Sequence, residues 1–339
     1  MTTGPRKNER KKDNKHLMMF LGASVAIILV AAVIVANFTV IKDTVNGMWY
    51  RPTPEMEQIR ASLNLTGTGY RIFNASMPEL MERVEFNSVC REVENEAAIL
   101  GCYTDDKIYI FNIVDDELLG IKELTTAHEL LHAVYNRMSE GDKNRWSGVL
   151  NEVYLDNKEV LGEEIDLYKD RQKQEELYVR IGTEIKNLPE ELEKHYAEIF
   201  DDQDKVVDFY ESYITVFREI EQKLGELQKQ IESLKTEIDD KTTKYETGAE
   251  SLNAKIKEFN TCAGTMNCFG TTREFNNKRA AIIAEQESVK KLYAEIDALI
   301  QKYNALINEY NQNILHGQML NMTINSSMSL NEQVEEVED

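Results

Sequence analysis

Apolar residues recur at alternating spacings of four and three over a long stretch in the second half of the chain. This spacing keeps the apolar side chains on one face of a helix and is typical of a coiled coil. The first run consists of Val206, Tyr210, Tyr213, Phe217, Ile220, Leu224, Leu227, Ile231, Leu234 and Ile238. The second run consists of Val289, Leu292, Ile296, Leu299, Tyr303, Leu306 and Tyr310. Each run would leave an apolar stripe in water, so each predicts a helix that is covered by another helix.

The residues between the two runs indicate how the helices pair. The stretch "NTCAGTMNCFGTT", residues 260–272, contains glycines and two cysteines and is typical of a loop. We therefore predict a long antiparallel coiled-coil hairpin over residues 203–315, whose arms pair within one chain. Dimerisation of two chains through the same apolar runs is the alternative. The polar and acidic residues 316–339 are predicted to form a disordered tail.

A hydrophobic segment of a different kind lies near the N-terminus. Residues 17–41 contain no charged side chain, and a helix of this length can cross about 30 Å of hydrocarbon, so the segment predicts a transmembrane helix. A cleaved signal peptide is the alternative, but its apolar segment is usually only about 7–15 residues long. Residues 1–16 are basic and are predicted to be cytoplasmic. The prediction is a single-pass cell-membrane protein with the remainder outside the cytoplasm.

Residues 42–202 show shorter patterns, which predict a small α/β domain that becomes helical toward its end. The stretches "YRIFNAS" and "AAILGCYTDDKIYIFNI" are predicted to contain strands, with a helix at about 78–89 between them. Two apolar runs flank Thr104, Asp105 and Asp106 and predict a β-hairpin. Helices are expected near 141–156, 158–170, 172–186 and 189–201. The fold class is therefore α+β and mostly α.

The net charge and the cysteines of the chain limit which partners it can bind and which cellular compartment suits it. The net charge of -21 makes nucleic-acid binding an unfavourable function, because an acidic surface repels phosphates. The four cysteines fall into two close pairs, Cys90 with Cys102 and Cys262 with Cys268. Two local disulfides in an oxidising compartment are predicted, with free thiols as the alternative. A zinc knuckle is not favoured, because neither pair has Cys-x-x-Cys spacing or a nearby histidine.

The motif with the strongest chemical signal is His128-Glu129-x-x-His132 in "TTAHELLHAVYNRM". In a helix, residues four apart lie on one face, so both imidazoles can bind one metal ion. Glu129 lies beside that face and can act as general base toward a water at the metal. Two structural histidines, or a degenerate site without metal, are the alternatives.

At these residues the chain resembles the gluzincin branch of zinc metallopeptidases, and the resemblance covers about residues 70–200. It implies a zincin-like domain, a Zn²⁺ cofactor, and a third ligand that is a glutamate from a later helix. No His-x-x-Gly-x-x-His continuation follows His132, which sets the metzincins aside. The gluzincin Glu-x-x-x-Asp pattern is also absent. Counted from Glu176, the position of the aspartate is occupied by Arg180.

The third ligand is predicted to be Glu176, since the neighbouring Leu177 and Ile181 indicate a helix packed beneath the site. Glu184, expected directly after a helix break at Gly182, is the second candidate. The remaining candidates are Glu163, Glu164 and Glu175. For the hydrogen-bond donor to the transition-state oxyanion, we expect His195, with Tyr178 and Tyr196 as alternatives.

The expected function is a membrane-anchored extracytoplasmic zinc metallopeptidase that acts on an exported peptide or protein. An extended substrate is expected to pair with an edge strand, for which "KIYIF", residues 107–111, is the first choice. The alternative function is a catalytically inert surface interaction protein, whose hairpin binds a protein partner.

Overall fold

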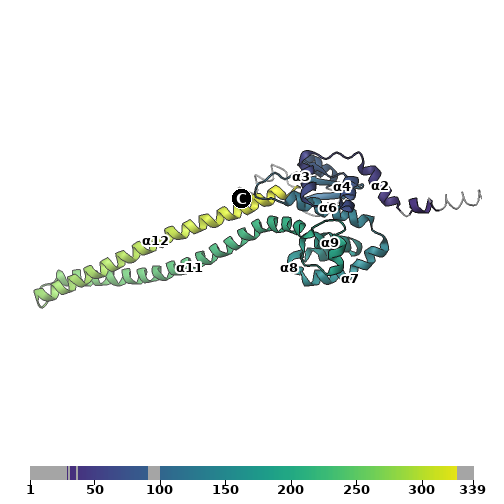
Figure 1. Cartoon of the computed structure of the whole chain (residues 1–339). Helices are drawn as coiled ribbons and strands as arrows, with labels where there is room; N and C mark the ends of the chain where they lie inside the picture. Colours follow the sequence, from purple (N-terminus) through teal and green to yellow (C-terminus); the bar gives the residue numbers. More distant parts are fainter. Residues whose placement is uncertain (1–28, 30, 36, 91–99, 327–339) are drawn as a thin grey trace, which may run out of the picture. The chain divides into compact units, whose positions relative to one another are not determined.

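The described part of the chain is mostly helical (Figure 1) and contains a small three-stranded sheet. The computed structural model describes residues 29, 31–35, 37–90 and 100–326. The described chain forms two compact units, one reaching Ile214 and resuming at Thr323, the other comprising Thr215–Met322. The elements are α2 (Phe38–Gly47), α3 (Pro54–Ser62), α4 (Gly67–Ser76), β1 (Glu79–Met81), α5 (Arg83–Cys90), β2 (Gly101–Thr104), β3 (Lys107–Phe111), α6 (Ile121–Arg137), α7 (Glu140–Asp156), α8 (Lys158–Leu161), the 3-10 helix η1 (Glu164–Leu167), α9 (Asp170–Glu184), α10 (Glu190–Tyr196), α11 (Gln203–Ala263) and α12 (Thr272–Ile324).

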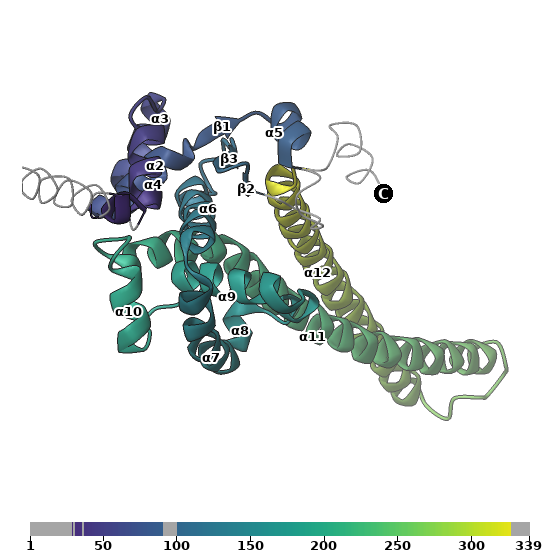
Figure 2. The ribbon, with the colours of Figure 1, turned by 90° about the vertical axis from the view of Figure 1, so that its right-hand side faces the viewer.

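The sheet has the strand order β1-β3-β2 (Figure 2). β3 pairs with β2 in antiparallel orientation, and the connecting residues Asp105 and Asp106 both have positive φ, as a tight two-residue turn requires. The β-hairpin predicted at these residues is confirmed. The expectation that "KIYIF" is an edge strand is wrong, because β3 also pairs in parallel with β1 and so lies in the centre of the sheet.

Two other predictions for the first part of the domain need correction. The stretch "YRIFNAS" is not a strand but the main part of α4, because the hydroxyl of Thr66 caps the helix at the amide of Gly69 and the buried Ile72, Phe73 and Ser76 follow helical spacing. The helix expected at 78–89 is preceded by β1 and begins only at Arg83.

The core of this unit is built around α6, the helix that carries the His-Glu-x-x-His motif. Leu130 and Leu131 of α6 are completely buried, and α9 packs alongside. A Cβ atom at Gly182 of α9 would lie 2.6 Å from the Leu131 side chain, so only glycine permits this approach. Gly182 is therefore a packing position inside α9 and not the helix break that its sequence suggested.

The expected fold class is wrong in one element, the transmembrane helix predicted at residues 17–41. Within the described residues, no helix is both long enough and apolar enough to cross a membrane. Residues 17–28, 30 and 36 of that prediction lie outside the described residues, as does the basic segment 1–16. Its last residues, from Phe38, belong to the ten-residue helix α2.

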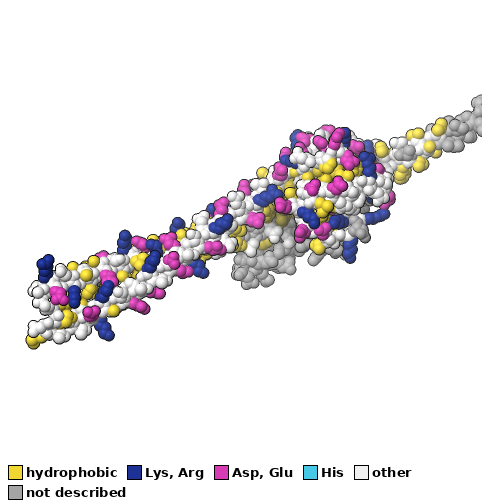
Figure 3. Space-filling model, turned by 90° about the horizontal axis from the view of Figure 1, so that it is seen from below, with side chains coloured by type: hydrophobic (Ala, Val, Ile, Leu, Met, Phe, Trp, Pro, Cys, Tyr) yellow, Lys and Arg dark blue, Asp and Glu magenta, His cyan; other side chains and the backbone are white. Residues whose placement is uncertain are grey.

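The second unit consists of the greater parts of α11 and α12, which run antiparallel to each other (Figure 1). Ion pairs connect the arms at three levels: Lys223 with Glu309, Lys241 with Glu295, and Lys255 with Glu285. Every side chain of the two predicted apolar runs is buried or half-buried. The 61 residues of α11 correspond to about 90 Å of helix. Figure 3 shows charged side chains of both signs interspersed along this hairpin.

The arms thus pair within one chain, as predicted, although the boundary at 315 is too early. α12 continues to Ile324, and the rest of the expected tail, residues 327–339, lies outside the described residues.

The structure forms both disulfides, with Cα–Cα separations of 5.8 Å for Cys90–Cys102 and 5.3 Å for Cys262–Cys268. The second bond closes the tip of the hairpin, where the rings of Phe259, Phe269 and Phe275 also pack together. Paired apolar runs and ring packing hold the arms, so the disulfide serves mainly to order the short loop.

Replacing Cys262 and Cys268 by serine should therefore leave the helix content unchanged. The loss of unfolding free energy should be about 2 kcal/mol or less, because the closed loop is short. Circular dichroism and denaturant titration of the variant measure both quantities. Collapse of the helical signal, or cross-links between residues 210–238 and 289–310 that form only between different molecules, would contradict the intramolecular hairpin.

Candidate metal site

α6 places two imidazoles one helical turn apart on its surface. The Nε2 atoms of His128 and His132 are 3.3 Å apart, and the two rings meet edge to face. Leu131 and Val134 on other faces of α6 are buried in the core, which fixes the orientation of the helix. The two histidines therefore present nitrogen atoms toward one point.

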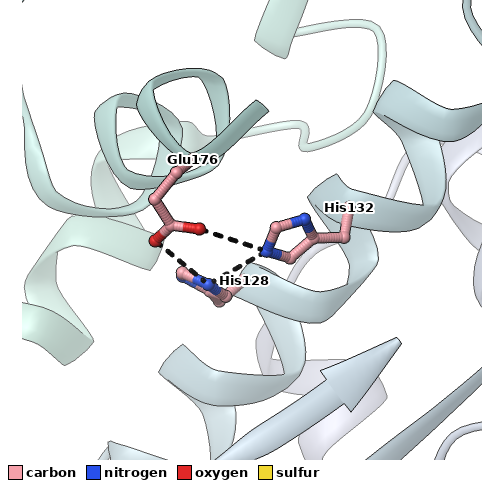
Figure 4. Close-up of side chains that lie close together, drawn as sticks. All are labelled: His128, His132 and Glu176. Carbon is pink, nitrogen blue, oxygen red and sulfur yellow. Dashed lines mark hydrogen bonds and ion pairs between the residues drawn. The ribbon is translucent and has the colours of Figure 1, made fainter. Parts of the chain in front are cut away.

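α9 brings a carboxylate to the same point (Figure 4). The oxygen atoms of Glu176 lie 3.8 Å from Nε2 of His128 and 3.6 Å from Nε2 of His132. The three side chains offer ligand atoms that all lie within 4.8 Å of one another, and among the described residues they are the one such group. Of the five glutamates considered from the sequence, the structure thus brings Glu176 to the two histidines.

The donor set fits a zinc ion. Two ligands on a tetrahedral zinc, at roughly 2.0–2.1 Å from the metal, are about 3.3 Å apart, which is the separation of the two Nε2 atoms. The Glu176 oxygen atoms are only slightly farther away. Two imidazoles and one carboxylate supply three protein ligands, and this number leaves a fourth position for water or substrate.

Glu175 supports His132 from the side opposite the metal position. Its carboxylate lies 2.9 Å from Nδ1 of His132 and accepts the hydrogen from that nitrogen. This hydrogen bond holds the ring so that Nε2 faces Glu176 and His128. Burial alone would lower the pKa of His132, but the hydrogen bond to Glu175 and the charges of Glu129 and Glu176 raise it to about 9.

His128 has the opposite protonation preference. Burial lowers its pKa well below the usual value, and the nearby charges of His132 and Arg180 lower it further. In the metal-free protein, the pair is therefore expected to carry one positive charge at neutral pH, because His132 is protonated on both ring nitrogens and His128 is neutral. Binding of a metal ion to Nε2 of both rings would release the additional proton of His132.

Glu129 faces the sheet beside the site. Its side chain is only 3% exposed and lies against β2. A Cβ atom at Gly101 would lie 2.7 Å from Cγ of Glu129, so the absence of a side chain at Gly101 leaves space for this carboxylate. Sequence reasoning missed Gly101, although a glycine inside a strand often marks a close approach of other atoms to the backbone.

His195 does not join the group. Its ring stacks near Trp146 with centroids 4.8 Å apart, and its Nε2 lies 3.0 Å from Oη of Tyr178. Tyr178 follows Glu176 by two residues, which is about 200° around the helix, so it faces away from the triad. Oη of Tyr196 donates to the backbone oxygen of Tyr178. All three expected oxyanion donors thus lie in an aromatic cluster on the far side of α9.

The other glutamate candidates have different surroundings. Glu184 forms two hydrogen bonds with Arg180, at 2.7 and 2.9 Å. Glu163 is exposed, and Glu164 belongs to η1, before α9 begins. Neither Glu184 nor Glu163 belongs to the group of converging ligand atoms.

Comparisons of the chain with protein-family models, with curated proteins and with solved structures found no match. The functional argument therefore depends on the site itself.

The geometry predicts a ranking of zinc affinities. Glu176→Ala removes a ligand and should weaken zinc binding most. Glu175→Ala removes the support of His132 and should weaken it by roughly 10–100-fold. Glu184→Ala should have little effect, because its carboxylate is bound to Arg180. Competition with a chelator measures all three affinities. A larger loss for Glu184→Ala than for Glu176→Ala would give the ligand role to Glu184.

Gly101→Ala should destabilise the protein by about 1–3 kcal/mol, because the added methyl group collides with Glu129 and Thr125. Gly148→Ala is the matched control, since open space surrounds that glycine within a helix. Thermal and chemical denaturation measure the two changes. Equal stability of both variants would mean that β2 does not lie tightly against Glu129.

Proposed function

We propose that the chain is a zinc metallopeptidase that hydrolyses peptide bonds in an exported peptide or protein. The observation that carries the proposal is the convergence of His128, His132 and Glu176 at distances that suit tetrahedral zinc, with Glu129 next to them on α6. The two disulfides support an oxidising compartment outside the cytoplasm.

Each residue has a distinct task in this proposal. Zinc bound at the triad would supply Lewis-acid polarisation of the scissile carbonyl and acidify water. Glu129, on the same helix as both histidines, accepts the proton of the attacking water and returns it to the leaving amine. Glu175 keeps His132 oriented through its hydrogen bond to Nδ1. The buried position of Glu129 beside β2 limits its motion and excludes bulk water around it.

The substrate strand is assigned to β2 in place of "KIYIF". β2 pairs with β3 along one edge, and in the described part of the chain no other strand pairs with it. An extended peptide can add to this edge through main-chain hydrogen bonds. Gly101 of β2 packs against Glu129, so a peptide bound there would lie near the proposed base.

A surface interaction protein remains the second candidate, and the hairpin tip favours it. Met266 at the tip is 93% exposed, and the rings of Phe259, Phe269 and Phe275 pack against one another at the same end of the hairpin. Methionine is enriched at protein–protein interfaces, so an exposed methionine at the tip is compatible with contact to a protein partner. In this second function, the metal site would not be used for catalysis.

Glu129→Gln decides between the two candidates. The substitution keeps the size of the side chain but removes the base, so hydrolysis of a peptide library should be abolished while zinc content stays near one ion per chain. His128→Ala should lose both zinc and activity. Metal analysis and mass spectrometry of the digested library provide the measurements. Wild-type protein that binds no zinc would refute the peptidase proposal, and loss of zinc in Glu129→Gln would mean that Glu129 is a ligand.

A further inference from the structure

Both arms of the hairpin begin or end in the unit that contains the metal triad. α11 starts in that unit and leaves it after Ile214, while the last residues of α12 rejoin it from Thr323. Each helix continues without interruption from one unit into the other. We call residues 203–214 the first root of the hairpin and residues 323–326 the second root.

The first root contacts both helices that carry the triad. The side-chain amide of Gln203 donates to the backbone oxygens of Gly182 and Ile185 at the end of α9, at 2.9 and 3.1 Å. These oxygens would otherwise lack a partner where the helix ends. Phe209 lies against Gly120, the residue that precedes α6, with atoms 3.2 Å from the position of a Cβ. The first root thus touches the end of the Glu176 helix and the start of the histidine helix.

The second root contacts the strand beside Glu129 through α5. Arg83 and Asn87 of α5 donate to the backbone oxygens of Asn325 and Ser326, directly after the end of α12. The last residue of α5, Cys90, is bonded to Cys102 of β2. Gly101, the preceding residue of β2, packs against Glu129. Two hydrogen bonds, a disulfide and one packed contact therefore connect the second root to the proposed base.

We propose that the two roots are positioning elements through which the hairpin regulates the metal site. The first root positions the zinc ligands and the second root positions β2 and Glu129. Packed side chains, hydrogen bonds and rigid helices of this kind can carry coupling between distant sites. A partner that binds the hairpin and shifts one arm against the other would change the position of the base relative to the ligands. This regulatory role rests on the proposed function, whereas the mechanical coupling can be tested without it.

The test uses the full chain and hydrogen exchange of residues 100–111 and 121–132, read by mass spectrometry. Asn87→Ala removes a contact of the second root and should raise exchange in 100–111 on the order of tenfold. Leu227→Asp disrupts the apolar run outside the roots, where Leu227 is 1% exposed, and should raise exchange in the same segment. Lys229→Asp, an exposed position on the same arm, is the matched control and should leave exchange unchanged.

Two readouts separate coupling from simple loss of packing. The combined Asn87→Ala and Leu227→Asp variant should exchange no faster than the more affected single variant, because both act through one contact, whereas independent distant sites would add. The variants should also hydrolyse peptide several-fold more slowly than wild type with unchanged zinc content. Should Leu227→Asp fail to fold, Leu227→Ala takes its place.

Exchange in 100–111 that is the same for Leu227→Asp and Lys229→Asp would overturn the coupling. So would additive effects in the combined variant. A chain that exchanges as expected but binds no zinc would refute the peptidase function and leave the coupling intact, so the two failures can be told apart.

Discussion

The close approach of α6 and α9 is the contact on which the candidate site depends. The two helices supply all three converging ligand atoms, and their separation is set at Gly182, where any side chain would collide with Leu131 or Tyr196. Interiors of proteins are tightly packed, so a larger residue at this point would move one helix away from the other. The metal site is therefore a product of core packing between two helices as much as of the His-Glu-x-x-His motif.

The electrostatics of the site follow from this packing. Four ionisable side chains of the motif and of α9 gather in a mostly buried region: two imidazoles and the carboxylates of Glu175 and Glu176. Opposite charges in such a region stabilise each other, whereas a like charge nearby disfavours the charged form of a side chain. Burial lowers the pKa of His128 and the charge of His132 lowers it further, whereas the hydrogen bond to Glu175 and the neighbouring carboxylates raise the pKa of His132 against the effect of burial. A divalent cation bound to both Nε2 atoms would displace the additional proton of His132 and balance the carboxylates more fully.

Elements and residues that carry a periodic or local pattern can be predicted from the sequence, whereas contacts between elements far apart in the sequence cannot. The alternation of four and three residues revealed the hairpin, and the motif revealed His128 and His132, because both patterns repeat within one helix. Glu176 was found because apolar neighbours marked a buried helix. The central position of β3 was missed, since it depends on pairing with β1, a strand of three residues from another part of the chain. His195 is the first choice from the sequence because few histidines lie outside the motif, but its place in an aromatic cluster is decided by how α10 packs on α9.

The hydrogen bond between Arg83 and Asn325 joins residues 242 positions apart. During synthesis, α5 and the sheet leave the ribosome long before the end of α12 has been made. The contact between Arg83 and Asn325 can therefore form only after residue 325 has been synthesised. The hairpin itself can pair from its tip, because its first contacts are local, and this pairing brings the end of α12 back toward α5. The order of synthesis therefore makes hairpin formation a step in completing the unit that contains the metal triad.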